Sequence, residues 1–360
     1  MRRVRLAVVD HRSHPDAWAR DLAISTEAVQ LHLASDVIDL HVDSFIWTRV
    51  FGYDLRTRHG AGLFGGDFLS QVDFPRILEA GVTGAIWSIT TNPLRSAAGR
   101  GRAFAANLAR LRGIFASVPE QFALVRSAAE YRAARAAGKH GAFVGIQGGN
   151  AIDRDPSALD LLVDDLVVRV TLVHLSSSSL GATSAPTRRG PDTGLTGAGR
   201  EMVRALEARR VLVDLAHVSR RGFFDAVEAH DRSRPLVVTH TGVSGVHPHW
   251  RNLDDEQLRA IADSGGTIGV MYHSSFLCGS SSCRSSVVVD HLAHIVDTVG
   301  EDHASLGSDW DGTIMPPTDM KTCLELPRLV QHMLDRGWSD VRIRKILGEN
   351  FLRVLAAVRG

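Results

Sequence analysis

His41 and Asp43 are the first residues of this chain whose types and spacing suggest chemistry. They end the stretch Val37-Ile-Asp-Leu-His-Val-Asp43, which is apolar enough to form a buried strand. On an extended chain, residues two apart point the same way, so His41 and Asp43 present an imidazole and a carboxylate to one point. A divalent metal ion needs such donors. An isolated pair of this kind is more often structural, so its meaning depends on the rest of the chain.

Several later apolar runs also end at a polar residue of this kind. The runs are short, rich in Val, Ile and Leu, and bounded by Gly, Pro or polar residues, which is typical of buried parallel strands. They occupy residues 141–146, 167–173, 211–216, 235–239 and 303–308, and they lead in turn to Gln147, His174, His217, His240 and Asp309. Two further runs, at residues 82–89 and 266–272, bring the predicted strands to about eight.

Segments with helical spacing separate these runs. They include residues 101–112, 196–209, 254–262 and 286–296, and Thr196 is a suitable N-cap for the second. About eight strands alternating with helices predict a (β/α)8 barrel of the TIM type, which at ~250 residues plus loop insertions suits this length. In that fold the active site lies at the carboxyl ends of the strands, where these His and Asp residues fall.

The composition favours one domain and removes several classes of partner. No Pro/Ser-rich linker or block of charge divides the 360 residues, and 44% hydrophobic residues suffice for a core. We expect a single domain over residues 1–360, with residues 1–35 as a helical extension packed on the barrel. A net charge of +1 gives no electrostatic reason to bind nucleic acid or an anionic membrane.

The start of the chain and its cysteines indicate a cytoplasmic protein. Asp10, His11 and Arg12 interrupt the first apolar run well short of a signal-peptide core, so we expect no secretion. No stretch approaches the ~18 apolar residues of a membrane span. Three cysteines are too few for a disulfide scaffold. Cys278 and Cys283 could form a local disulfide, but we expect surface thiols.

A set of motifs resembles the renal (membrane) dipeptidase family of zinc peptidases, within the wider amidohydrolase superfamily. The resemblance extends from about Asp36 to about Val354. Each motif alone is a weak signal, but the set in this order is strong. The motifs are Ile38-Asp-Leu-His-Val-Asp43, Gln71-Val-Asp-Phe-Pro-Arg76, Gly81-Val-Thr-Gly-Ala-Ile-Trp87, Gly145-Ile-Gln-Gly-Gly149, Gly194-Leu-Thr196, Val213-Asp-Leu-Ala-His-Val-Ser219, Thr239-His-Thr241, Arg251-Asn252, Gly307-Ser-Asp-Trp-Asp-Gly312 and Gly348-Glu-Asn-Phe-Leu-Arg-Val354.

The resemblance implies a site for two zinc ions. His41, Asp43 and Asp309 would hold one ion, and His217 with His240 the other. In the family, a glutamate after the third strand bridges both ions. Two cations ~3.5–4 Å apart would make hydroxide available at neutral pH to attack the peptide carbonyl. Asp309 would take the proton and pass it to the leaving amine.

Two further matches imply how a substrate is bound. His174 matches the family histidine that polarises the scissile carbonyl and stabilises the oxyanion. Arg251 matches the arginine that grips the terminal carboxylate of the substrate, for which a planar guanidinium is suited. From the residues alone, His174 would more often be a packed residue at a strand end, and Arg251 could be a surface partner of Asp254 or Asp255.

The chain departs from the family pattern at the bridging position. Gln147 stands where the family has the glutamate, and Asn150 stands where it usually has histidine. A neutral amide oxygen compensates the repulsion between two cations less well than a carboxylate does. We therefore predict about one ion or fewer per chain, with the His217–His240 ion bound more weakly. The alternative is a conservative replacement that leaves both ions in place.

Other polar residues receive supporting roles. Asp311 is expected to support Asp309 rather than to bind metal. Asp214 is expected to point into the barrel or to hydrogen-bond a neighbour. The remaining histidines are expected to be solvated or capping residues, namely His32, His230, His247, His249, His291, His294 and His303.

These patterns favour a metal-dependent, dipeptidase-like hydrolase that cuts dipeptides or small amides with a free carboxylate. A catalytically silent relative that binds a small molecule is a second interpretation, favoured by Gln147 and Asn150. Hydrolysis of lactones or N-acyl amino acids is a third, because the barrel supports many chemistries. The expected cofactor is Zn²⁺ and the expected partner a dipeptide or other small molecule, with homodimerisation left open.

Overall fold

The strands of this protein form one parallel barrel. The computed structural model describes residues 3–60, 62, 64–92, 94–153, 166–188 and 190–360. In this part of the chain the strand order is β1-β2-β4-β5-β6-β7-β8-β9, with β3 beside β4. Val42 bridges Trp310, just beyond β9, and the Asp43 amide donates to the Trp310 carbonyl over 2.9 Å. This contact joins the two edges into the nearly closed eight-stranded barrel that the sequence predicts.

All eight predicted strands are present. They are β1 (Ile38–Val42), β2 (Gly84–Thr90), β4 (His140–Gln147), β5 (Val167–Thr171), β6 (Leu212–Asp214), β7 (Val237–Thr241), β8 (Thr267–Val270) and β9 (Ala304–Leu306). β1 and β4 are buried along their whole length, because helices cover one face and side chains fill the barrel on the other. The sequence analysis missed β3 (Phe122–Leu124), since three residues are too few for a periodic signal.

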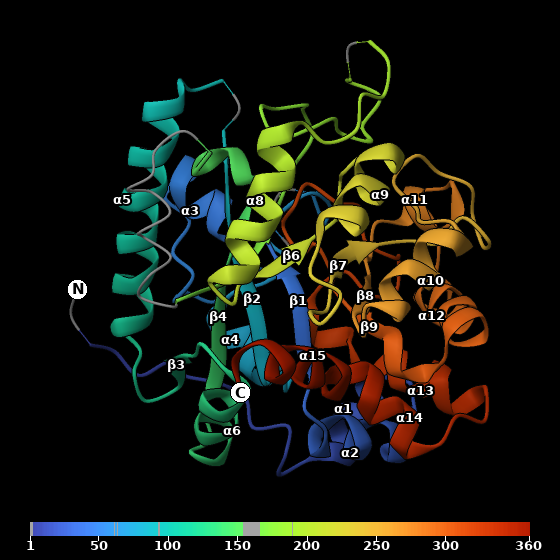
Figure 1. Cartoon of the computed structure of the whole chain (residues 1–360). Coiled ribbons are helices and arrows are strands. Elements are labelled where there is room, and N and C mark those ends of the chain that lie inside the picture. Colours follow the sequence, from blue (N-terminus) through green and yellow to red (C-terminus); the bar gives the residue numbers. More distant parts are fainter. Residues whose placement is uncertain (1–2, 61, 63, 93, 154–165, 189) are drawn as a thin grey trace.

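Helices surround the barrel, with α5 at one edge and α10 and α12 at the other (Figure 1). The longer ones are α5 (Ala97–Ala116), α6 (Ala128–Ala136), α8 (Gly197–Ala208), α9 (Arg220–Ala229), α10 (Asp255–Asp263), α12 (Ser286–Val299), α13 (Pro327–Asp335) and α15 (Asn350–Arg359). The four helices expected from spacing are α5, α8, α10 and α12. Thr196 caps α8 as expected, because its hydroxyl accepts the Gly199 amide over 3.1 Å.

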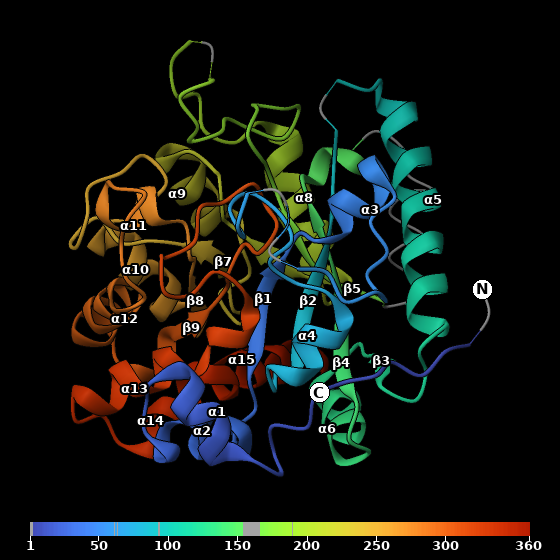
Figure 2. The ribbon, with the colours of Figure 1, turned by 180° about the vertical axis from the view of Figure 1, so that it is seen from behind.

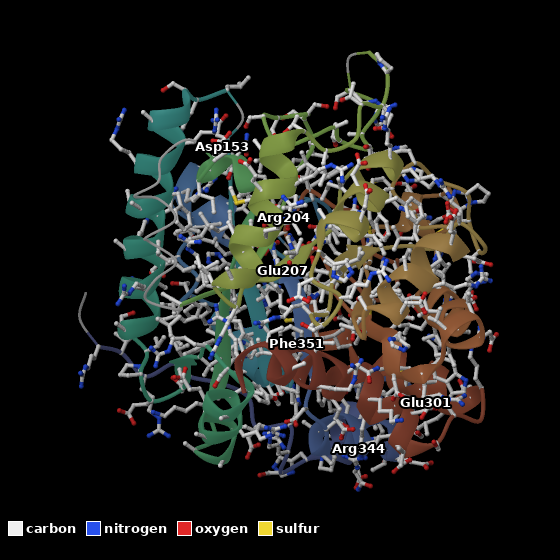
Figure 3. The ribbon with its side chains drawn as sticks, in the orientation of Figure 1. Asp153, Arg204, Glu207, Glu301, Arg344 and Phe351 are labelled. Atoms are coloured by element: carbon white, nitrogen blue, oxygen red, sulfur yellow. A yellow bond between two sulfur atoms is a disulfide. The ribbon has the colours of Figure 1, made fainter. Side chains whose placement is uncertain are left out.

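Aromatic side chains pack a helix against the outer face of the barrel. Phe351 of α15, labelled in Figure 3, is 1% exposed. Its ring meets the ring of Phe143 on β4 edge-on, with 5.4 Å between centroids. Such contacts stabilise the strands against the helical layer, so the polar residues at the strand ends are held on a rigid frame.

Two short helices precede the first strand. They are α1 (Pro15–Leu22) and α2 (Thr26–Ala34), and α2 packs against α13. Seen from behind, they lie below the barrel, at the end opposite to the loops that follow the strands (Figure 2). Among the described residues, no helix combines the length and the apolar character that crossing a membrane requires.

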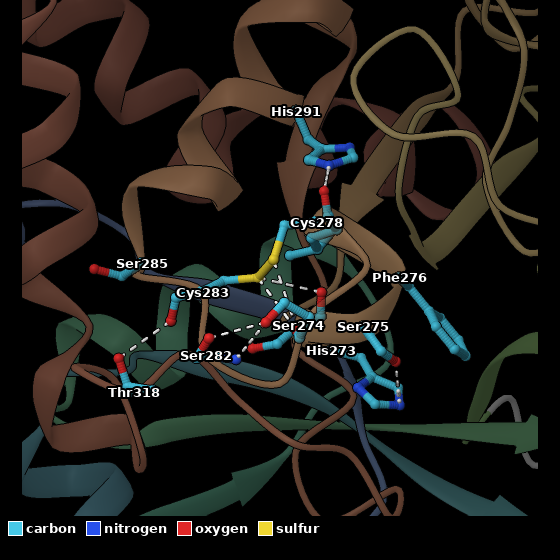
Figure 4. Close-up of a disulfide and its surroundings, with 12 residues drawn as sticks. His273, Ser274, Ser275, Phe276, Cys278, Ser282, Cys283, Ser285, His291 and Thr318 are labelled. Carbon is cyan, nitrogen blue, oxygen red and sulfur yellow. Dashed lines mark hydrogen bonds between the residues drawn. A yellow bond between two sulfur atoms is a disulfide. The ribbon is translucent and has the colours of Figure 1, made fainter.

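Cys278 and Cys283 correct an expectation, because they form a disulfide and are not free thiols (Figure 4). Cys278 ends α11 (Ser274–Cys278), and the chain turns back so that the two Cα atoms lie 6.5 Å apart, within the range that a disulfide spans. The turn is held as well by the Thr318 hydroxyl, which donates to the Cys283 carbonyl over 3.3 Å. Local spacing alone could not show that the intervening serines allow this return.

Two histidines expected to be solvated are buried instead. His32 lies inside α2, and its Nε2 donates to the Ala80 carbonyl over 2.7 Å. His291 accepts the Val243 amide at Nδ1 and donates from Nε2 to the Leu277 carbonyl, over 2.8 and 2.9 Å. Both imidazoles join segments that are distant in the sequence, which explains why a polar side chain is tolerated in the core.

Candidate active site

The predicted site residues gather at the carboxyl ends of the strands. His41 and His240 lie in the last two residues of β1 and β7, and Gln147 is the last residue of β4. His174, His217 and Asp309 each stand three residues beyond their strands, β5, β6 and β9. Parallel strands end on the same side of a barrel, so residues far apart in the sequence meet at its mouth.

Distances show how closely these side chains approach. His41 Nε2 is 3.5 Å from Asp43 Oδ1 and 3.7 Å from Asp309 Oδ1. The Nε2 atoms of His217 and His240 are 2.8 Å apart, and the rings of His41 and His240 have centroids 3.8 Å apart. In the described part of the chain, His41, His240 and Asp309 form the group of residues whose donor atoms, all within 4.8 Å of one another, could hold a metal ion.

The backbone is strained where it delivers two of these side chains. His217 has φ 66° and Asp309 has φ 62°, in the left-handed region that most residues avoid. A Cβ at Gly312 would lie only 2.2 Å from Asp309 Oδ1, so the turn needs glycine at that position. Strain of this kind costs ~1–3 kcal/mol per residue and concentrates at functional sites.

His240 is held ready to donate a lone pair. The Thr239 hydroxyl donates to Asp214 Oδ2 over 2.7 Å and lies 2.9 Å from His240 Nδ1. A hydroxyl has one hydrogen, and here it goes to the carboxylate, so Thr239 must accept from the Nδ1–H of His240. His240 Nε2 is then without hydrogen and faces the site. Asp214 therefore hydrogen-bonds its neighbours, as expected, and fixes a site imidazole through Thr239.

The hydrogen bonds of His41 favour the other tautomer, with the ring hydrogen on Nε2. Arg169, buried inside the barrel, lies with Nη2 2.8 Å from His41 Nδ1. A guanidinium only donates, so Nδ1 accepts and the hydrogen of the neutral imidazole sits on Nε2. Burial lowers the pKa of His41, although Asp43 opposes this, so the neutral form is favoured. Gly145 makes room for this contact, because a Cβ there would lie 2.8 Å from Arg169 Cζ.

Gln147 completes a hydrogen-bonded network with His41 and Asp43. Both groups of its side-chain amide are hydrogen-bonded when the nitrogen donates to Asp43 Oδ2 over 2.9 Å and the oxygen accepts from His41 Nε2 over 3.2 Å. This arrangement agrees with a hydrogen on His41 Nε2. Thr90 adds a hydroxyl 2.9 Å from Asp43 Oδ1. The network occupies the position at which the family resemblance implies a bridging glutamate.

Arg251 lies beside this cluster and is not a surface residue. Its side chain is buried, and Nη2 donates to the His240 carbonyl over 2.6 Å. Burial lowers its pKa to about 10, with Asp309 acting in the opposite sense. Its Nε is buried and has no hydrogen-bond partner among the described residues. The surface alternative fails, since Asp254 pairs with Arg220.

His174 and Asp311 complete the surroundings. The His174 ring lies 4.7 Å from that of His217, edge to face. Burial lowers the pKa of His174 to about 4, so the ring is neutral near pH 7. Asp311 is buried away from the cluster, where Oδ1 accepts the Gln71 amide over 2.8 Å and Oδ2 binds the Ser44 hydroxyl. These contacts hold the turn that also carries Asp309, and the support of Asp309 by Asp311 stays a prediction.

Sequence reasoning missed Arg169 and Thr90. Arg169 had a visible signal, because it is the one charged residue in the apolar run 167–173. A charge inside a buried strand needs a partner, and here it has Asp214, with 3.7 Å between Nε and Oδ2, besides His41. Thr90 had no such signal, since threonine is common at strand ends.

Comparison with known proteins identifies the family. A family model described as membrane dipeptidase (peptidase family M19) matches residues 25–360. The chain belongs to the membrane dipeptidase family. The solved M19 metallopeptidase described as dipeptidase AC is 30% identical, with a TM-score of 0.79 over 90% of this chain and 98% of that one. A metallopeptidase from Rhodobacter sphaeroides, liganded with a phosphinate mimic of the dipeptide L-Ala-D-Ala, is 27% identical, with a TM-score of 0.80 over 90% and 99% of the two chains.

Two other comparisons are less informative about chemistry. An amidohydrolase from Pseudomonas aeruginosa is 24% identical, with a TM-score of 0.76 over 92% of this chain and 98% of that one, which shows the shared fold. A Klebsiella pneumoniae relative, described as an uncharacterized protein in the pqqA 5' region, is 37% identical over 174 residues. That match spans 47% of this chain and 63% of the relative.

The candidate donor residues of this M19 member are not equally able to bind a metal ion. His240 presents a lone pair, and Asp309 adds a carboxylate within the same group. His217 Nε2 donates to His240 Nε2 over 2.8 Å, and an ion bound at His240 would replace this hydrogen bond. The ring hydrogen of His217 can then sit on Nδ1, which is buried and has no partner among the described residues. His41 differs, because its Nε2 can lose the hydrogen to Nδ1 only if Arg169 moves. The residues fit a cation on the His240 side and do not fit the two-ion arrangement that the family resemblance implied.

Proposed function

We propose that this chain is a metal-dependent, dipeptidase-like hydrolase acting on dipeptides or small amides with a free carboxylate. One observation supports it most: the guanidinium of Arg251, whose Nε has no hydrogen-bond partner among the described residues, is buried directly beside the residues spaced for a metal ion. A buried donor without a partner is costly, and a substrate carboxylate would satisfy it. The M19 relative that carries a dipeptide mimic is consistent with this assignment.

We further propose one zinc ion, held through His240, with Asp309 and His217 as its neighbouring donors. This reverses the expected order of affinity, in which the His217–His240 side is the weaker. The reason is the hydrogen on His41 Nε2 and the neutral amide of Gln147, which together disfavour an ion on the other side. When bound, the ion would supply Lewis acidity that polarises the scissile carbonyl and lowers the pKa of a water.

Three side chains carry out the remaining steps of binding and catalysis. Arg251 binds and orients the terminal carboxylate, which places the amide over the cluster. His174, neutral near pH 7, donates a hydrogen bond to the oxygen that becomes negative. Asp309 accepts a proton from the attacking water and delivers it to the leaving amine.

The proposal is tested by hydrolysis of a free dipeptide and of the same dipeptide with an amidated C-terminus, before and after adding Zn²⁺ to chelator-treated protein. We expect zinc-dependent cleavage of the free dipeptide and a much lower kcat/KM for the amidated one. Zinc-independent cleavage, or equal cleavage of both substrates, would contradict the proposal.

A second candidate is a catalytically silent family member that binds a small carboxylate. The network of Arg169, His41, Gln147 and Asp43 favours it, because four side chains hydrogen-bond one another where the ion of His41, Asp43 and Asp309 was expected. The absence of cleavage with added Zn²⁺, together with carboxylate binding that depends on Arg251, would support this candidate over the hydrolase.

A further inference from the structure

A cavity of about 240 Å³ beside the active site is lined by four arginines. It lies between α3 (Phe45–Phe51), the end of β2 and α5, which stand next to one another in both views (Figures 1 and 2). Arg49 comes from α3, Arg95 from the loop after β2, and Arg100 and Arg110 from α5. Among the described residues that line it, none is Asp or Glu.

The spacing along α5 explains how one helix lines the cavity. Arg100, Ala103, Asn107 and Arg110 follow one another at intervals of three or four residues, so they share one helix face. Asn107 adds amide hydrogen-bonding groups between the two guanidinium groups. Arg102 belongs to the same helix but not to the cavity lining, which makes it a natural control.

The described residues compensate the positive charge of the cavity only in part. Arg100 pairs with Asp153, labelled in Figure 3, with 3.4 Å between Nη2 and Oδ1. Among the described residues, Arg49, Arg95 and Arg110 have no carboxylate partner within ion-pair distance. Burial lowers the pKa of Arg49, Asp43 raises it, and Arg95 and Arg110 lower it further. These guanidinium groups repel one another, which a bound anion would relieve.

Thr90 connects this cavity to the active site. Its carbonyl accepts from Arg49 Nη1 over 2.7 Å, and its hydroxyl bonds Asp43 Oδ1 over 2.9 Å. The strand order places β2 four positions from β7 around the barrel, so the two strands lie on opposite sides. Arg251 follows β7. The two cationic positions therefore flank the metal-spaced cluster from opposite sides of the mouth.

We propose that this cavity binds a second anionic group of the substrate, a carboxylate or phosphate on the acyl side of the scissile amide. The position of the amide rests on the proposed hydrolase function, whereas anion binding by the cavity does not. A substrate with acidic groups at both ends would span the mouth, with one end on Arg251 and the other among Arg49, Arg95, Arg100 and Arg110. Planar guanidinium groups suit both carboxylate and phosphate.

Anion binding is tested first, by calorimetric titration of the full chain with citrate and with inorganic phosphate. The variant is Arg95→Gln combined with Arg110→Gln, because neither side chain has a hydrogen-bond or ion-pair partner in the part of the chain that the structure describes. Arg102→Gln is the matched control on α5. We expect the double variant to weaken binding at least about tenfold, as lost charge-assisted hydrogen bonds would, and the control to leave it unchanged. No binding by the unmodified chain, or equal weakening by both variants, would overturn the proposal.

Substrate preference is tested next, with dipeptides matched in size. Glu-Ala is compared with Gln-Ala, and phosphoserine-Ala with Ser-Ala, which separates a carboxylate from a phosphate. We expect one acidic dipeptide to exceed its neutral partner at least about tenfold in kcat/KM, with the advantage lost in the double variant and kept in Arg102→Gln. Equal cleavage of acidic and neutral dipeptides would overturn the cavity assignment and leave the hydrolase intact. Cleavage of none, with anion binding that needs Arg95 and Arg110, would overturn the hydrolase and support the cavity.

Discussion

Replacing Arg169 by methionine should increase the affinity of this chain for Zn²⁺. In the native chain, Arg169 donates to His41 Nδ1 and so keeps the ring hydrogen on the nitrogen that faces the metal cluster. Methionine fills similar space but cannot donate. The hydrogen of His41 can then move to Nδ1, where the Ser88 hydroxyl stands 3.3 Å away to accept it. His41 Nε2 would then offer a lone pair to the ion.

The expected size of the effect follows from the hydrogen bond that zinc binding must otherwise break. A hydrogen bond from a charged donor contributes ~1.5–3 kcal/mol, so its removal should strengthen zinc binding roughly 10- to 100-fold. Loss of a buried positive charge near the ion acts in the same direction. Asp214 keeps four donors after the change, the hydroxyls of Thr171 and Thr239 and the amides of Ala216 and Thr239, so the barrel should remain folded.

The assay is calorimetric titration of chelator-treated protein with Zn²⁺, with the melting temperature as a check on folding. Arg169→Lys is the matched control, because it keeps a cationic donor near His41 and should gain much less. Nitrogen-15 spectra of the metal-free protein, assigned with His41→Gln, should show hydrogen on His41 Nε2 in the native chain and on Nδ1 in Arg169→Met. A folded Arg169→Met protein with native zinc affinity, or a native His41 with its hydrogen on Nδ1, would refute this reasoning.

Four further predictions use the same cluster and frame. Gln147→Glu should raise the metal content measured by elemental analysis, because a carboxylate compensates cation repulsion; unchanged content would show that the bridging charge is irrelevant. Arg251→Ala should cost ~2–5 kcal/mol in kcat/KM for a free dipeptide but little for its amide, whereas Arg259→Ala, an exposed change on α10, should alter neither. His174→Ala should lower kcat about 10²- to 10³-fold for both substrates; an effect on KM alone would remove its oxyanion role. Thr196→Ala should lower the free energy of unfolding by ~1 kcal/mol in denaturant titrations, and no loss would mean that the cap is dispensable.

The barrel could be predicted because its strands are long apolar runs with a polar residue at the end. β1 and β4 are buried throughout, so their sequences carry no alternation and read as parallel strands. Once parallel strands are predicted, the fold itself requires that His41, His240 and Asp309 meet. The resemblance to the dipeptidase family added roles for Arg251 and His174, which strand patterns alone do not supply.

The hydrogen-bond state of the cluster could not be predicted. Arg169 is visible as a charge in an apolar run, but its partner His41 lies on a strand that is not its neighbour in the sheet. Which nitrogen of His41 carries hydrogen depends on that contact across the barrel. The arginine cavity has the same origin, because Arg49, Arg95 and Arg110 come from three separate segments. Such features depend on side-chain positions, which sequence periodicity does not predict.

The most direct test follows dipeptide hydrolysis during a zinc titration of the chelator-treated native chain. If one ion held through His240 supports catalysis, the rate should rise with added Zn²⁺ and saturate at one ion per chain, and His240→Ala should abolish the rise. Saturation at two ions per chain, or no hydrolysis at any zinc concentration in a protein that binds the ion, would contradict a single-zinc dipeptidase.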